Sequence, residues 1–437
     1  MKREEGLGLA QLLDYVRILS EEIGPRGPTT AKEAEAGRYV MSRLKEQGLK
    51  VLMQEFKAPS SFSWAFLVYY LGALIGAVLY GFNPLVTVTL GGLMAAGYFL
   101  EGNTYPVLAP LMPGGKSANI VGKYAPWRDA RRRVVVMAHY DSSRAALNFS
   151  PKLVKGFRQS YLITSAAILL APLVGLGGFF ASPGQAVWQL LFAVEILLAI
   201  VLLFPVVTLV HREIFGKFTP GANDNASGVA VMLGVGDLLA QGELAATEVW
   251  LVATGAEESG TNGAINFIKE HGEQLRDSLF INLDNLGSGD LKFITREGML
   301  WTYPADSELV SLARRAVAGF AGPGPLIGQG QVETATTASG AREGDSEGDS
   351  GDDGGGNGVQ GPLSIGPAQY RTLTTDGLAL AARGHRVMGI MAFDDDGVLP
   401  NWHWPTDVIE NVDGNNLEEA RELVWRIIKQ VDARATS

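Results

Sequence analysis

The chain has 437 residues, a formal net charge of −10, 47% hydrophobic residues and no cysteine. The lack of Cys excludes disulfides and thiol catalysis, and the acidic balance gives no sign of nucleic-acid binding. Once the apolar stretches described below are set aside, the remaining length suits one large domain.

The first 57 residues predict the amino-terminal part of a soluble domain. Residues 10–22 and 30–47 carry apolar residues three and four positions apart, which predicts two amphipathic helices. Residues 49–56 follow as a predicted strand. Residues 1–13 carry four early charges and no apolar core of signal-peptide length, so we expect no cleaved signal peptide.

A first apolar hairpin follows at residues 58–100. None of these 43 positions is charged, and the sequence Gly-Phe-Asn-Pro at 81–84 interrupts the run. A helix needs about 20 residues to cross a hydrocarbon core of about 30 Å. The stretch therefore predicts two membrane spans, 62–80 and 84–100, and Gly72 and Gly76 place small residues on one helix face for close packing.

A second apolar hairpin occupies residues 159–210, after a soluble segment at 101–158. It predicts spans at 161–181 and 186–210. Glu195 is the single charge within the four spans. An intramembrane carboxylate suggests a function, but a protonated or helix-paired structural Glu explains it as well, because no other ionisable group lies in a span.

Four spans would place all soluble parts on one side of a lipid bilayer. Two short uncharged turns would face the other side. The soluble side carries flanking basic residues, namely Lys57, Lys152, Lys155, Arg158, Arg212 and Lys217. By the positive-inside rule we expect a multi-pass protein of the cell membrane whose soluble domain lies in the cytoplasm.

Polar side chains stand at the ends of predicted strands. Further strands are predicted at 118–124, 133–137, 248–254, 279–283, 292–295 and 387–393, and a last helix at 416–433. His139, the pair Glu257-Glu258, and Asp284 each follow one of these strands. An open α/β sheet forms its crevice at such strand ends. We therefore expect an α/β fold with a mixed, mainly parallel sheet, helices on both faces, and two transmembrane hairpins as interruptions.

The sequence also contains the ligands that two neighbouring zinc ions need. They are His139, Asp224 in the sequence Gly-Ala-Asn-Asp-Asn-Ala-Ser-Gly at 221–228, Glu258, Asp284 and His403. Zinc takes histidine nitrogens and carboxylate oxygens, and three carboxylates with a hydroxide would nearly balance two zinc ions. The other histidines, His211, His271 and His385, lie in an interfacial or polar context, where we expect no ligation.

Taken in chain order, these residues resemble the motifs of the co-catalytic two-zinc aminopeptidase family, which includes bacterial leucyl aminopeptidases and aminopeptidase Y. The similarity extends to Ile-Gly-Pro-Arg at 23–26, Ala-Asn-Ile-Val at 118–121, Thr375-Asp376, and His-Trp-Pro-Thr-Asp at 403–407. The resemblance implies that one zinc is bound by His139, Asp224 and Asp284, and the other by Asp224, Glu258 and His403. It further implies that Glu257 is the general base and that Asp141 holds the His139 ring.

The chain departs from the family pattern in three places. Trp402 stands where the family usually has Tyr or another hydrogen-bonding aromatic residue before the last His. The interval from His139 to Asp224 is 85 residues, far longer than in soluble relatives, because it contains the second hairpin. Residues 329–362 form an acidic, Gly-rich insertion that predicts a disordered loop.

The sequence thus predicts a membrane-anchored zinc aminopeptidase, with a peptidase domain made of residues 1–57, 101–158 and 211–437. Its partners would be peptide substrates and the lipid bilayer, with no nucleic acid. Signatures of other hydrolases, such as H-E-x-x-H and G-x-S-x-G, are absent from the sequence. The alternatives are a carboxypeptidase or glutaminyl cyclase on the same scaffold, or a non-catalytic membrane adaptor; the oligomeric state stays open.

Overall fold

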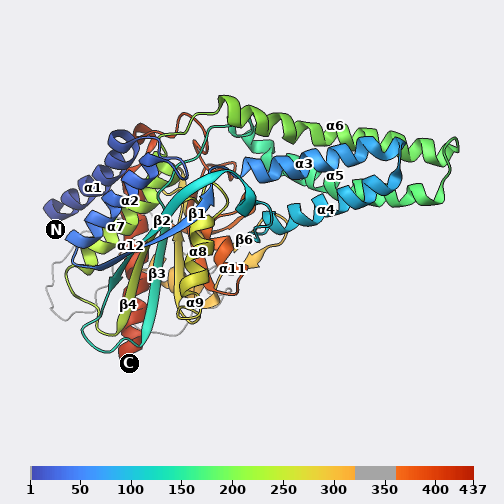
Figure 1. Ribbon diagram of the computed structural model, residues 1–437. Helices are drawn as coiled ribbons and strands as arrows, with labels where there is room; N and C mark the ends of the chain where they lie inside the picture. The colour runs from blue at the N-terminus through green and yellow to red at the C-terminus, as the bar shows by residue number, and fades with distance from the viewer. Residues whose placement is uncertain (1, 320–360) are drawn as a thin grey trace, which may run out of the picture.

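The polypeptide leaves an α/β domain twice to build a four-helix bundle, which projects from one side of that domain (Figure 1). The computed structural model describes residues 2–319 and 361–437. The predicted acidic insertion at 329–362 lies, except for its last two residues, outside the described residues.

The described residues contain one nine-stranded sheet, in the order β1-β2-β4-β3-β5-β9-β6-β7, with β8 beside β6. The strands are β1 Lys50–Pro59, β2 Gly114–Tyr124, β3 Arg132–His139, β4 Thr247–Thr254, β5 Leu279–Leu283, β6 Asp290–Glu297, β7 Tyr303–Pro304, β8 Gly366–Tyr370 and β9 Arg386–Phe393. The central strands β4, β3, β5 and β9 run parallel. The flanking pairs are antiparallel apart from β6 with β8. The mixed sheet is therefore confirmed, with its parallel part concentrated at the centre.

All seven predicted strands are present, each within a few residues of its expected bounds. β7 and β8 were not predicted. β7 has two residues and includes Pro304, and β8 has the sequence Gly-Pro-Ala-Gln-Tyr, which lacks an apolar alternation. Strands of this kind arise from pairing with β6 rather than from their own sequence pattern.

Helices cover both faces of the sheet. On one face lie α1 Lys2–Arg17, α2 Ala31–Glu46, α7 Gly228–Leu239, α9 Ser307–Val317 and α12 Gly414–Thr436, and on the other α8 Asn262–His271 and α11 Asp376–Ala381. Successive residues of β3 point to opposite faces. Val134 and Val136 pack with the first group, and Val135 and Met137 with the second. This double burial explains the unbroken apolar run of β3.

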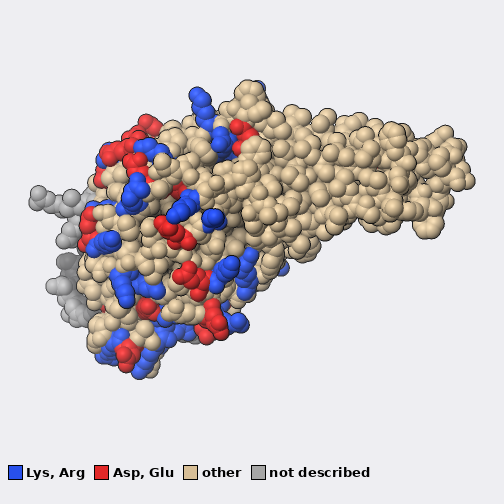
Figure 2. All heavy atoms as spheres, in the orientation of Figure 1, with Lys and Arg blue, Asp and Glu red and all other residues tan. Residues whose placement is uncertain are grey.

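The bundle consists of α3 Ser63–Val78, α4 Pro84–Gly102, α5 Phe157–Gly177 and α6 Ala186–Phe215. Among the described residues, these four helices, taken with the short turns beside them, are long and apolar enough to cross a membrane. Figure 2 shows the charged side chains gathered on the α/β domain, while the visible face of the projecting bundle is almost free of them. A Cβ atom on Gly76 would lie 3.5 Å from the backbone nitrogen of Gly91, so the small residue allows α3 and α4 to pack closely.

Glu195 lies on α6 and is completely buried in the bundle. Neither of its carboxylate oxygens has a hydrogen-bond partner among the described residues. Among the described residues, no neighbouring helix therefore supplies the partner that a helix-paired Glu195 would need.

Each hairpin enters and leaves the α/β domain through a pair of adjacent backbone segments. The first hairpin connects β1 to β2, whose pairing extends to Pro59 opposite Gly114. At the second hairpin, the Ala145 amide donates to the Lys217 carbonyl at 2.9 Å and the Thr219 amide to the Ser143 carbonyl at 2.8 Å. These paired segments, which we call the stems, explain how 85 residues separate His139 from Asp224 without moving them apart in space.

Candidate metal centre

The loops at the carboxyl ends of the central strands bring the predicted ligands together. His139 is the last residue of β3, Asp284 follows β5 directly, and His403 lies in the loop after β9. Glu258 follows β4, and Asp224 lies in the turn before α7. All five side chains are buried. The structure therefore places them in the crevice that the strand pattern predicted.

Asp224 lies between the two histidines. Its Oδ1 is 3.2 Å from Nε2 of His139, and its Oδ2 is 3.1 Å from Nε2 of His403. Each Nε2 also faces a second carboxylate, Asp284 at 3.6 Å from His139 and Glu258 at 3.3 Å from His403. The result is two three-residue clusters that share Asp224.

The chemistry of these clusters fits metal ions. The Oδ2 atom of Asp224 and the Oε1 atom of Glu258 are buried and lack a hydrogen-bond partner among the described residues. Burying carboxylate oxygens without partners is costly unless they are paired or bind a metal. Two imidazoles and three carboxylates are the donors that zinc takes in open sites. Each cluster can therefore hold one ion, with Asp224 common to both.

The glutamate pair is held by its backbone in an irregular turn after β4. Ala256 has a positive φ of 51°, and its amide donates to Glu33 at 2.8 Å. The two oxygens of Asp141 accept hydrogen bonds from the amides of Glu257 at 3.1 Å and Glu258 at 3.0 Å. This turn lets adjacent residues face one site, which a regular strand would forbid.

Asp141 has a different set of contacts from the one that the resemblance implied. Its Oδ1 lies 3.5 Å from Nδ1 of His139, at the outer limit for a hydrogen bond. Its two shorter contacts are those with the amides of Glu257 and Glu258. In this structure Asp141 therefore lies beside the His139 ring, while its hydrogen bonds position the glutamate pair.

Burial and neighbouring charges perturb the pKa values of the clustered groups. Burial raises the pKa of Glu257 well above its usual range, and the nearby carboxylate of Asp376 adds to the rise. Burial also disfavours the charged form of Asp224, but the adjacent imidazoles of His139 and His403 outweigh it and hold the pKa of Asp224 below its usual range. A carboxylate with a raised pKa, as at Glu257, is suited to accepting and returning a proton.

Two charged residues from distant parts of the chain fix the loop before Asp224. Arg26 is completely buried and donates to the carbonyls of Tyr140 at 2.6 Å and Gly221 at 2.7 Å. Asp407 accepts hydrogen bonds from the amides of Asn223 at 2.6 Å and Asp224 at 3.3 Å. The motifs at 23–26 and 403–407 thus meet at the turn that carries Asp224.

The Thr375-Asp376 pair anchors the start of α11 next to the centre. The Thr375 hydroxyl accepts from the Gly377 amide at 3.0 Å and donates to Glu297 at 2.7 Å. The Asp376 carboxylate accepts from the Thr254 hydroxyl at the end of β4, at 2.5 Å. The pair therefore ties two strands to the helix that borders the site.

Tyr370 is a site residue that sequence reasoning missed. It is the last residue of β8 and lines the small cavity that contains the clustered ligands. Burial raises the pKa of Tyr370 well above its usual range, and the Asp284 carboxylate adds to the rise. No motif marks this tyrosine, since it follows the acidic insertion on a strand without an apolar pattern.

Trp402 and the remaining histidines have packing roles. Trp402 is buried, with its ring 4.7 Å from Phe149 and 4.8 Å from His403.

His271 packs on Trp250, and His385 on Phe280, each with ring centroids 5.5 Å apart. Both histidines are partly buried. His211 packs on Phe215 at 5.0 Å. Among the described residues, none of these contacts brings His211, His271 or His385 into the ligand clusters.

Part of the chain is similar to a known protein family. Residues 208–323 match the sequence profile of Peptidase family M28. This segment contains Asp224, Glu257, Glu258 and Asp284, whereas His139 and His403 lie outside it. Comparison with curated protein sequences gave no match.

Several solved structures are similar over almost the whole chain. A glutaminyl cyclase of Bacteroides thetaiotaomicron has a TM-score of 0.52 at 16% identity, covering 96% of this chain and 97% of its own. A leucine aminopeptidase precursor of the same species has a TM-score of 0.52 at 16% identity, covering 96% of both chains. An aminopeptidase of Aneurinibacillus has a TM-score of 0.51 at 14% identity, covering 97% of this chain and 93% of its own.

At such identities the similarity establishes the fold and leaves the activity to be argued from the site. The relatives include both aminopeptidases and glutaminyl cyclases, so the subtype that the sequence motifs suggested is not established by them. The chain shares the mixed α/β fold of these solved structures, and the segment that matches the Peptidase family M28 profile carries Asp224, Glu258 and Asp284 of the ligand clusters.

Proposed function

We propose that this protein is a membrane-anchored zinc aminopeptidase that hydrolyses the first peptide bond of its substrates. The observation that carries the proposal is the shared Asp224 carboxylate, with one His and one further carboxylate on each side. Glu257 stands beside this double cluster, within reach of both His139 and Glu258.

The proposed site gives each residue a defined task. His139, Asp224 and Asp284 would hold one zinc, and Asp224, Glu258 and His403 the other. A bound zinc pair lowers the pKa of a water and polarises a carbonyl. Glu257 takes the proton from the attacking water and gives it to the departing amine.

Tyr370 and Asp141 support this chemistry from two sides. Tyr370 lines the same small cavity as the ligands and can donate a hydrogen bond to the carbonyl oxygen as negative charge builds up on it. Asp141 fixes the turn that aims Glu257 and Glu258 at the site. Buried carboxylates around the cavity also favour a positively charged amino terminus over a blocked one.

Metal content and substrate range test the proposal together. Purified full-length protein should contain two zinc ions per chain by elemental analysis and lose activity to a chelator. Peptides with a free amino terminus should be cleaved, and the same peptides carrying an acetyl group should be spared. Equal cleavage of both would indicate an endopeptidase, and a zinc-free, inactive protein would favour the adaptor.

A glutaminyl cyclase is the second candidate, because one solved cyclase has the same fold over nearly the whole chain. A cyclase releases ammonia from an amino-terminal glutamine and leaves the peptide bond intact, and we expect it to work with one zinc. Assays on a glutamine-initiated peptide therefore separate the two activities, while peptides shortened from the other end would identify a carboxypeptidase. The adaptor is disfavoured, because a cluster of buried carboxylates has no structural benefit without its metals.

The membrane placement is part of the proposal. Four apolar helices project together from the α/β domain, and the face visible in Figure 2 shows the charges gathered on the domain. Basic residues such as Lys57, Lys155 and Arg158 stand where the helices meet the domain. By the positive-inside rule, the catalytic domain lies in the cytoplasm of a cell-membrane protein.

A further inference from the structure

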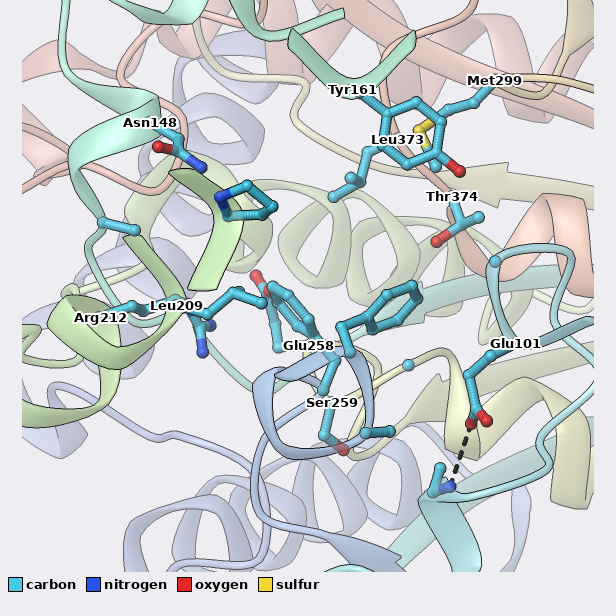
Figure 3. Close-up of a pocket in the computed structure, with 18 of the residues that line it drawn as sticks. Glu101, Asn148, Tyr161, Leu209, Arg212, Glu258, Ser259, Met299, Leu373 and Thr374 are labelled. Atoms are coloured by element: carbon cyan, nitrogen blue, oxygen red, sulfur yellow. Dashed lines mark hydrogen bonds between the residues drawn. The ribbon is translucent and has the colours of Figure 1, made fainter. Parts of the chain in front are cut away.

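A cavity of about 170 Å³ lies between the bundle and the metal-binding cluster. Residues of all four bundle helices line it, together with Glu257, Glu258 and Ser259 from the turn after β4. Figure 3 shows Leu209, Glu258 and Tyr161 arranged around this common space. The bundle therefore forms a wall next to the reactive centre as well as a membrane anchor.

This cavity adjoins the small cavity at the ligand clusters, because the two share part of their lining. Glu257, Glu258, Leu373 and Thr374 line both. The small cavity has a volume of only about 20 Å³, which is little more than the space for one water. The adjoining larger cavity therefore offers the space for the first side chain of a peptide whose first carbonyl reaches the cluster.

The larger cavity has a mostly apolar wall. Its aromatic and aliphatic side chains include Phe62, Phe66, Tyr70, Phe157, Tyr161 and Leu209. Burying apolar surface against such a wall contributes about 25 cal/mol per Å². The cavity therefore favours a large apolar group.

The charged groups on the bundle side of the cavity are engaged in local contacts. Glu101 accepts hydrogen bonds from the Leu108 amide at 2.8 Å and the Tyr69 hydroxyl at 2.7 Å. Arg212 Nη1 donates to Ser61 at 2.9 Å and lies 2.9 Å from the Glu213 carboxylate. These contacts neutralise Arg212 and satisfy Glu101, so neither selects a charged substrate side chain.

The cavity lies where the bundle would enter the membrane surface. Its lining residues come from the domain-proximal ends of the helices, such as Phe66 of α3 and Leu209 of α6. Phe204 lines the cavity and is also 46% exposed on the outer surface of α6. Trp301, 55% exposed, packs on Phe99 of α4 and is suited to the interfacial zone of a bilayer. The wall of the cavity is thus continuous with the lipid-facing surface.

From this geometry we propose that the cavity binds the apolar amino-terminal segment of a peptide located at the membrane surface. The bundle then determines substrate class, because its helices supply most of the apolar wall. This inference rests on the proposed aminopeptidase function and deepens it by naming the substrates as membrane-associated peptides that begin with large apolar residues.

Photo-crosslinking tests the position of the substrate without requiring turnover. The full-length protein in phospholipid vesicles is irradiated with a free-amino peptide that carries benzoylphenylalanine as its first residue. We expect cross-links to α3, α5 and α6. Cross-links confined to the α/β domain would overturn the inference. It would also be overturned if a photoreactive phospholipid labelled the cavity residues of these helices and prevented the peptide from cross-linking to them.

The second experiment measures peptide hydrolysis by a variant whose cavity has been narrowed. Ser160→Phe adds bulk to the cavity wall on α5, and Ala166→Phe adds similar bulk to an exposed position on the same helix. Ser160→Phe should lower kcat/KM for peptides beginning with Phe by about tenfold or more, mainly through KM. Peptides beginning with Ala should change little, and Ala166→Phe should behave like the wild type. Equal losses for both peptides, or in both variants, would contradict the inference.

The two experiments distinguish a failure of this inference from a failure of the proposed function. Cross-links to the bundle without hydrolysis of any peptide would preserve the cavity assignment and overturn the aminopeptidase proposal. Hydrolysis with cross-links elsewhere would overturn the cavity assignment and preserve the aminopeptidase proposal.

Discussion

Oδ2 of Asp224 lies 3.1 Å from Nε2 of His403. Asp224 precedes α7 and His403 follows β9, so the two residues lie far apart in the sequence. Oδ1 of Asp224 lies 3.2 Å from Nε2 of His139. A single side chain therefore belongs to both ligand clusters. Removing it should affect both metals at once, whereas removing any other ligand should affect one more than the other.

The first prediction concerns this shared carboxylate. Asp224→Ala should abolish binding of both zinc ions, because the remaining ligands supply only two donors to each position. Elemental analysis of the purified variant measures the loss. Asp290→Ala, at an exposed residue of β6, is the matched control and should keep both ions. Two ions retained in Asp224→Ala would refute the ligand assignment.

The second prediction separates the two adjacent glutamates. Glu257→Gln keeps the size of the side chain but cannot accept a proton, so kcat should fall by about 10²–10⁴-fold with near-normal zinc content. Glu258→Gln removes a ligand oxygen and should lose metal, chiefly from the position shared with His403. Identical metal content in the two variants would show that this division of roles is wrong.

The third prediction concerns Asp141. Its two oxygens accept from two consecutive amides, and Asn offers only one acceptor oxygen. Asp141→Asn should therefore misplace the glutamate turn and weaken zinc affinity by about 10–100-fold. Competition with a chelating dye measures this affinity. An unchanged affinity with unchanged kcat would mean that the two amide contacts are dispensable.

The fourth prediction concerns Tyr370. Tyr370→Phe removes only the hydroxyl, so zinc content should stay at the wild-type level while kcat falls by about 10²-fold, as for the loss of one oxyanion donor. Tyr124→Phe, on β2 away from the centre, is the control. If kcat in Tyr370→Phe matched the control, the hydroxyl would have no part in the reaction.

The fifth prediction concerns topology. Cysteines introduced at Asn83 and Gly184, in the two turns at the far end of the bundle, should react with a membrane-impermeant thiol reagent on intact cells. A cysteine at Ser437 should be protected until the membrane is broken. The native chain has no Cys, which leaves the background clean. The reverse pattern would place the catalytic domain outside.

Local sequence signals predicted much of the structure. The apolar run before His139 marked a strand buried on both faces, and its end marked the site, because both properties depend on consecutive residues. The four apolar helices were equally readable from their composition. These features need no knowledge of the rest of the chain.

Other features depend on contacts between distant segments and had no local signal. Arg26 and Asp407 hold the loop before Asp224 from opposite ends of the sequence. β8 forms by pairing with β6 and brings Tyr370 to the site. The hydrogen bonds of Asp141 with the glutamate amides arise because β3 and β4 are adjacent in space, although a hairpin and a helix separate them along the chain. Sequence motifs identified Arg26, Asp141 and Asp407, but only the fold shows what they contact.

The position of the stems in the chain limits when the ligand clusters can assemble during synthesis. Both hairpins precede Asp224, Glu258, Asp284 and His403 in the chain, and only His139 comes before the second hairpin. The stem between residues 143–145 and 217–219 closes only when the second hairpin has returned to the domain. Because domains of growing chains fold as their segments emerge, His139 can meet the later ligands only after the second hairpin has been made and has returned to the domain. In the membrane-anchored enzyme proposed above, a chain whose second hairpin has not returned to the domain would therefore lack an assembled reactive centre.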